Sequence, residues 1–190
     1  MNNVRVVVIL FAPLLAGLVV HGLCRRFGWL RSFGGPIDRG RTLRGRPLFG
    51  ASKTWRGVWS VALGTGAAYA ILAVIGVLPG GAAPSFGTGQ FAFIGAAMGA
   101  AAMLGELPIA FLTRQLGIAP WATARGIATP VFWLLDHVSV LPGAWLVLGP
   151  IVGVSWPRVA WSVAFVAITH ALVSMAAARA NRVAPVDRLP

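Results

Sequence analysis

Long apolar runs that carry almost no charge constrain the fold of this chain more than any other feature of its sequence. Only 11% of the 190 residues are charged and 57% are hydrophobic, and the mean hydropathy is +0.80. A soluble domain carries roughly a quarter charged residues, and a helix needs about 20 apolar residues to cross a bilayer. The sequence therefore predicts an all-α integral membrane protein, a single domain over residues 1–190, with five spanning helices near 4–24, 57–78, 91–113, 127–152 and 158–178.

The lysines and arginines predict how these spans are oriented. If the N-terminus lies outside, the inside segments hold fourteen basic residues, nine of them in the loop 25–56, against two outside. This bias places the C-terminus and the basic loop in the cytosol, with the protein in the cytoplasmic membrane. Topology and anionic lipid head groups explain the net charge of +12, so nucleic acid is not expected as a partner. Gly95 and Gly99 form a G-x-x-x-G pair that suits close helix packing, either within the bundle or between copies in a homo-oligomer.

The end of the basic loop is suited to binding phosphate at the mouth of the bilayer. Lys53 and Arg56 are spaced i and i+3 where the second span begins, so they are expected to share a helical face and to reach phosphate oxygens. A substrate bound there could leave its lipid tail in the membrane. Further donors nearby are the hydroxyls of Ser52 and Thr54 and the backbone amides at Gly45 and Gly50, where glycine allows close approach to an anion.

Two acidic residues fall inside predicted spans, at matched depth. At 1.5 Å per residue, Glu106 and Asp136 each lie about 12–14 Å inside the cytosolic face. A buried carboxylate without a partner costs several kcal/mol, so each is expected to pair with a cation. One alternative is a structural salt bridge to Arg114 or Arg125. The other is Mg²⁺, which is bound by one or two carboxylates together with substrate phosphates, and this alternative predicts a metal site at Glu106 and Asp136.

Four motifs follow one another in a fixed order along the chain: Leu48-Phe-Gly-Ala-Ser-Lys-Thr-Trp-Arg-Gly57, Gly105-Glu-Leu-Pro108, Phe111-Leu-Thr-Arg-Gln-Leu-Gly-Ile-Ala-Pro120 and Leu135-Asp-His-Val-Ser139. Over roughly residues 38 to 143 the chain resembles the CDP-archaeol synthase family, a branch of the membrane CTP-dependent lipid cytidylyltransferases that includes phosphatidate cytidylyltransferase. The resemblance implies transfer of CMP from CTP to a lipid phosphate monoester, with release of pyrophosphate and with Mg²⁺ as cofactor. The lipid would be phosphatidate-like or an isoprenoid ether-lipid phosphate.

The same resemblance assigns roles to individual residues. Lys53, Arg56 and Asp136 are the expected catalytic residues. Phosphate binding is expected from Ser52, Lys53, Thr54, Arg56 and Arg114, and metal binding from Glu106 and Asp136.

The chain also departs from the family pattern at a few positions. The fourth-span motif usually reads Asp-x-x-Asp, and here Ser139 replaces the second acid. Ala110 and Thr113 stand where a serine and a lysine are common. Two other functions therefore stay open beside the transferase. One is a relative that binds lipid phosphate or nucleotide without turnover, and the other is a small transporter or accessory subunit whose acids form an ion path.

Overall fold

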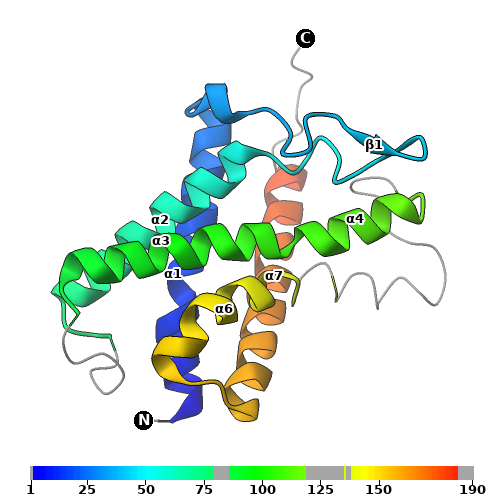
Figure 1. Ribbon diagram of the computed structural model, residues 1–190. Coiled ribbons are helices and arrows are strands. Elements are labelled where there is room, and N and C mark those ends of the chain that lie inside the picture. Colours follow the sequence, from blue (N-terminus) through cyan, green and yellow to red (C-terminus); the bar gives the residue numbers. More distant parts are fainter. Residues whose placement is uncertain (1, 79–85, 119–134, 136–137, 184–190) are drawn as a thin grey trace.

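The computed structural model describes residues 2–78, 86–118, 135 and 138–183, and this part of the chain is mostly helical (Figure 1). Its elements are α1 (Asn3–Arg26), the 3₁₀ turn η1 (Arg31–Phe33), β1 (Thr42–Leu43), β2 (Arg46–Pro47), α2 (Trp55–Val74), α3 (Thr88–Gly105), α4 (Leu107–Gln115), α6 (Val140–Val152) and α7 (Trp156–Val183). Within the described part, three stretches are long and apolar enough to cross a membrane, namely α1, α2 and the combined stretch of α3 and α4. The chain is therefore a helical, multi-pass membrane protein.

The first, second and fifth predicted spans correspond to α1, α2 and α7. Of the fourth, 127–152, the structure describes α6, which has 13 residues. Residues 127–134, 136 and 137 lie outside the described residues, so Asp136 cannot be placed, and Arg125 lies outside them as well. The count of five spans and their orientation stay predictions.

The third predicted span, 91–113, is interrupted at Glu106, where α3 has ended and α4 has not yet begun. Pro108 explains the break, because proline has no N–H to donate to the carbonyl oxygen of Leu104. The helix resumes at once, since the Ala110 N–H donates to the Glu106 carbonyl oxygen at 3.0 Å. The third predicted span is therefore present as the combined stretch of α3 and α4, with one backbone hydrogen bond missing beside Glu106.

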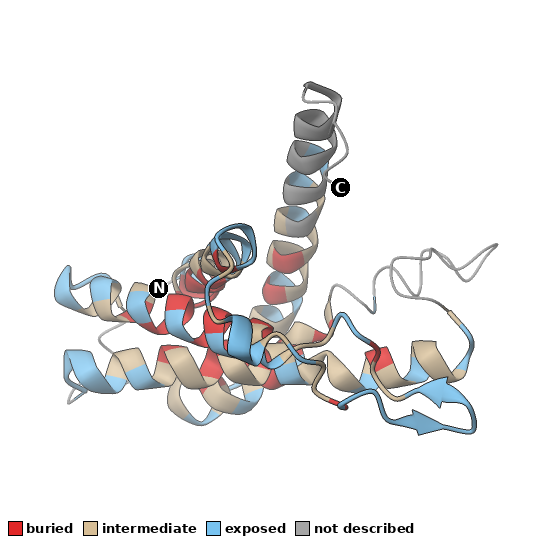
Figure 2. Ribbon diagram, turned by 90° about the horizontal axis from the view of Figure 1, so that it is seen from above, coloured by how far each residue is buried: buried red, intermediate tan, exposed pale blue. Residues whose placement is uncertain are grey.

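The core forms where α2 packs between α1 and α3, with α6 against α3 and α7 against α1. Figure 2 shows the buried residues concentrated where these helices meet. A Cβ built at Gly99 would lie 2.8 Å from the Val61 carbonyl oxygen, and one built at Gly95 would lie 2.7 Å from the Tyr69 side chain. The G-x-x-x-G pair therefore packs α3 against α2 within one chain, which decides between the two alternatives left open by the sequence.

The loop between α1 and α2 has a definite structure and contains the only strands in the described residues. β1 and β2 pair antiparallel, with Thr42 opposite Pro47. Arg44 and Gly45 connect them with φ of 52° and 77°, as a two-residue type I′ turn requires. Gln115 Nε2 donates to the Pro47 carbonyl oxygen at 3.1 Å, so the hairpin docks on the end of α4.

Candidate active site

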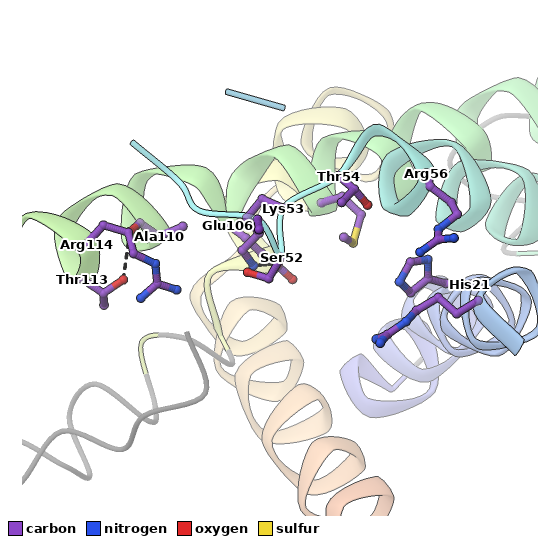
Figure 3. Close-up of a pocket in the computed structure, with 12 residues that line it drawn as sticks. His21, Ser52, Lys53, Thr54, Arg56, Glu106, Ala110, Thr113 and Arg114 are labelled. Carbon is purple, nitrogen blue, oxygen red and sulfur yellow. Dashed lines mark hydrogen bonds and ion pairs between the residues drawn. The ribbon is translucent and has the colours of Figure 1, made fainter. Parts of the chain in front are cut away.

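A cavity of about 570 Å³ lies where the interhelical loop, α1, α2, α3 and α4 converge. Most of its lining side chains are polar or charged, and several come from segments far apart in the sequence (Figure 3). It gathers every predicted site side chain that the structure describes, whereas Gly45 and Gly50 do not line it and Asp136 lies outside the described residues. The lining residues are His21, Arg25, Ala51, Ser52, Lys53, Thr54, Arg56, Met103, Glu106, Ala110, Thr113 and Arg114.

An ion pair between Lys53 and Glu106 occupies the middle of the cavity (Figure 3). Their side chains are only 18% and 19% exposed, so the pair is largely shielded from solvent. The partner of Glu106 is therefore Lys53 and not Arg114, which the sequence offered as a structural alternative. Glu106, at the junction of α3 and α4, lies opposite the loop that carries Lys53.

The backbone around Lys53 is fixed by two neighbouring segments. Its carbonyl oxygen accepts a hydrogen bond from the Ile37 N–H at 2.8 Å. Thr54, with extended backbone, caps α2, and its Oγ1 accepts from the Gly57 N–H at 3.3 Å. Because α2 begins only after this cap, Lys53 stands outside the helix that carries Arg56. The prediction that these two cations share a helical face is therefore wrong, although both line the same cavity.

Arg56 lies at one end of the cavity, beside two residues of α1 that the sequence did not single out, His21 and Arg25. His21 Nδ1 lies 2.7 Å from Ser60 Oγ. The Ser60 hydroxyl also donates to the Arg56 carbonyl oxygen at 2.6 Å, so Ser60 links His21 to the first turn of α2. A Cβ built at Gly57 would lie 3.3 Å from Met103 and 3.6 Å from His21, so a larger residue there would narrow this end.

The opposite end of the cavity is formed by α4. Arg114 and Thr113 lie there, separated from Arg56 and His21 by the Lys53–Glu106 pair (Figure 3). Thr113 Oγ1 donates to the carbonyl oxygens of Ile109 and Ala110, both at 2.9 Å. Ala110 and Thr113 are the positions where the sequence departs from the family pattern, and both line the wall of this cavity.

Asp38 organises the loop that presents Lys53, and sequence reasoning missed it. Its carboxylate, 6% exposed, accepts backbone N–H bonds from Gly40 at 2.9 Å, Phe49 at 2.8 Å and Gly50 at 3.0 Å. The amide of Gly50 is therefore engaged within the protein, and the prediction that it approaches a substrate anion is wrong. The sequence feature that could have identified Asp38 is its position two residues before Gly40, which is typical of an Asx turn.

The hydrogen bonds to Asp38 make the loop sensitive to acid. Burial acts to raise the pKa of Asp38, but the donors Phe49, Gly40 and Gly50 lower it, and the net result is a pKa below the usual 3.8. A carboxyl whose folded pKa is depressed contributes stability above its usual pKa and loses it as the pH falls through the folded value. We therefore expect cleavage of the loop by pepsin to rise as the pH is lowered from about 4 toward 2.

Asp38→Asn should open the same loop at neutral pH, since an amide has one acceptor oxygen and cannot satisfy all three N–H groups. Trypsin should then cut the loop faster than in the wild type, measured by mass spectrometry of the fragments. Asp187→Asn, at the far C-terminus, is the matched charge control. Equal cleavage rates in the two variants would contradict this role of Asp38.

The described residues fit a metal site only in part. Glu106 is the one carboxylate that lines the cavity among them, and they contain no group of three possible metal ligands. Mg²⁺ needs few protein ligands when substrate phosphates supply the rest, so one carboxylate beside a cationic pocket is compatible with a metal–triphosphate complex. The second predicted ligand, Asp136, is outside the described residues.

A multi-pass helical membrane protein with lysine and arginine side chains gathered around a largely shielded carboxylate has the charges needed to bind phosphate-bearing molecules. Residues 8–183 match the model of the CarS-like family, described as CDP-archaeol synthase. The chain belongs to this family.

Individual relatives agree with this assignment. A CDP-archaeol synthase of Hyperthermus butylicus is 38% identical over 155 residues, covering 79% of this chain and 80% of the relative. One of Halobacterium salinarum is 43% identical over 110 residues, and that match covers 56% of each chain. The fold is similar to a solved structure of an intramembrane enzyme for archaeal membrane lipid biosynthesis, with a TM-score of 0.64, 21% identity and coverage of 88% of this chain and 92% of that one.

Proposed function

We propose that the protein transfers CMP from CTP to a lipid phosphate monoester, giving a CDP-lipid and pyrophosphate, on the cytosolic side of the cytoplasmic membrane. The observation that carries the proposal is the cavity that gathers Lys53, Arg56, Arg114 and Glu106 in a chain of this family. Since the relatives are named CDP-archaeol synthases, we take an isoprenoid ether-lipid phosphate as the preferred acceptor. The positive-inside bias and the five predicted spans supply the orientation, with the basic loop in the cytosol.

The proposed reaction forms one P–O bond and breaks another. An oxygen of the lipid phosphate attacks the α-phosphorus of CTP, the bond from that phosphorus to the bridging oxygen breaks, and pyrophosphate leaves with the bonding electrons. Negative charge is spread over the phosphate oxygens throughout, so catalysis depends on positioning and neutralisation. Lys53, Arg56 and Arg114 line the cavity at separate points and would each contact a different phosphate group.

Mg²⁺ would be held by Glu106, with Asp136 as the second carboxylate, and would supply charge neutralisation at the triphosphate. If Glu106 held the ion, the Lys53 ammonium group would be available to a phosphate oxygen. The ion pair thus keeps both groups compensated inside the protein until substrate arrives.

The experiment uses purified protein in detergent with Mg²⁺, labelled CTP and a mixture of phosphatidate and isoprenoid ether-lipid phosphate. We expect a CDP-lipid and pyrophosphate, with the ether lipid as the main acceptor. Glu106→Gln should abolish the product, and omission of Mg²⁺ should do the same. CTP binding to a folded protein that forms no product from either lipid would contradict the proposal and favour binding without turnover.

A further inference from the structure

The two ends of the cavity are chemically different, which allows the two substrates to be assigned to them. We infer that the lipid phosphate binds at the α1 end, with its phosphate among His21, Arg25 and Arg56 and the start of its tail in an adjoining apolar cavity. The CTP triphosphate then occupies the end formed by Arg114 and Lys53. This inference rests on the proposed function and names the subsite of its acceptor.

The first observation is the separation of the cations. Figure 3 shows His21 and Arg56 at one end and Arg114 at the other, with Lys53 and Glu106 between them. Arg56 Nε is buried and has no hydrogen-bond partner among the described residues, so an anion would satisfy it. His21 is held by Ser60, so this end of the cavity is preorganised. The reaction needs two phosphate-bearing molecules to meet. The Lys53–Glu106 ion pair lies between the two proposed sites, where their phosphates would come together.

The second observation is a continuous stripe along α1. Leu14, Leu18, His21 and Arg25 follow at intervals of four, three and four residues, so they lie on one face of the helix. The first two line an apolar cavity and the last two line the cationic one. The stripe therefore passes from apolar to cationic along the helix, which matches an amphiphile that carries phosphate at one end.

The third observation is that the two cavities adjoin. The apolar cavity, of about 70 Å³, lies among α1, α2, α3, α6 and α7, and Met103 and Glu106 line both cavities. At about 30 Å³ for one water molecule, its volume holds only the first carbons of a tail. Leu18 lines this cavity and is also 44% exposed, so beyond the cavity the rest of the lipid tail would lie against α1 in the bilayer. CTP has no apolar part that would use this cavity.

Steady-state kinetics of the full chain in mixed micelles test the assignment. Arg25→Gln should raise the KM for the ether-lipid phosphate about tenfold and leave the KM for CTP within about twofold, since it removes one charge-assisted contact to the acceptor only. Arg26→Gln is the matched control, because Arg26 is exposed, adjacent and outside the cavity, and it should change neither value.

Thr169→Phe fills the apolar cavity and should also raise the KM for the lipid, whereas Ile168→Phe, at a position 59% exposed, should not.

A rise in the KM for CTP, with the KM for the lipid unchanged, would overturn the assignment. If Arg25→Gln does not fold, the KM values of Thr169→Phe and Ile168→Phe for the lipid and for CTP test the assignment instead. If the wild type forms no product, the proposed function fails, and equilibrium binding of labelled ether-lipid phosphate still tests the subsite. Weaker binding to Arg25→Gln than to Arg26→Gln would then support it, and equal binding would refute it.

Discussion

Replacing Lys53 with alanine is expected to lower CDP-lipid formation by about 100- to 1,000-fold, the usual cost of removing one preorganised group that stabilises developing charge. The variant loses a cation from the centre of the cavity and leaves Glu106, 19% exposed, without its ion-pair partner. The initial rate with labelled CTP measures the effect. Because Glu106 is largely shielded from solvent, the loss of its partner should also lower the unfolding midpoint, so the rates are compared at a temperature where both proteins are folded.

Lys53 is the only lysine in the chain, which gives a second and independent test. Lys53 and the N-terminal amine are the only amines that an amine-acylating reagent can label, and we expect the labelling to stop CDP-lipid formation. CTP with Mg²⁺ should slow both the inactivation and the labelling of the peptide that contains Lys53, while labelling of the N-terminus proceeds unchanged. Full activity of the alanine variant, or of protein labelled at Lys53, would rule out the proposed role.

The largest expected loss of stability comes from Gly143→Ala. A Cβ at this position would lie 1.8 Å from the Ala101 carbonyl oxygen, so α6 must move away from α3. Overpacking of a core typically lowers the free energy of unfolding by about 1–3 kcal/mol. Because the new methyl group would meet a backbone atom, which cannot rotate away, we expect a loss of about 3 kcal/mol or more. Because Gly143 also lies against Gly105, beside Glu106, the displacement should reduce activity as well as the unfolding midpoint in detergent.

Gly22→Ala is the matched control for that experiment. A Cβ at Gly22, within α1, would meet nothing within 4 Å. Alanine is favoured over glycine in helices by about 0.5–1 kcal/mol, so this variant should be as stable as the wild type or more so. Similar unfolding midpoints for the two variants would show that α3 and α6 do not pack as described.

Much of the helical architecture could be predicted from the sequence because membrane helices satisfy their own backbone and need long apolar runs. That rule locates α1, α2 and α7, and it predicts Lys53 at the mouth of the bilayer and Glu106 about 12–14 Å inside the cytosolic face. It does not predict their direct pairing, which is a tertiary contact between the loop that follows α1 and the junction of α3 and α4. A hydropathy pattern reports average polarity over many residues and does not register one contact between segments that are far apart in the sequence.

The α1 side of the cavity was not predicted for a different reason. His21 and Arg25 lie at the end of an apolar run, where basic residues commonly mark the membrane interface and carry no special meaning. Their position in the cavity depends on which neighbour α1 packs against, and that is a tertiary contact. Likewise, the i, i+3 spacing of Lys53 and Arg56 predicted a common face only because α2 was assumed to start before Thr54, its actual cap.

The docking of the β-hairpin on α4 has a consequence for the order in which the site can assemble. Arg46 donates to the Gln115 carbonyl oxygen and Gln115 donates to that of Pro47, across nearly seventy residues of chain. During synthesis α1 and α2 are complete well before Gln115 exists, so the arginine-rich loop is made without its partner. The cavity acquires its final form only after the helical hairpin of α2 and α3 has closed, which makes the binding site a late product of folding and the loop an early target for proteases.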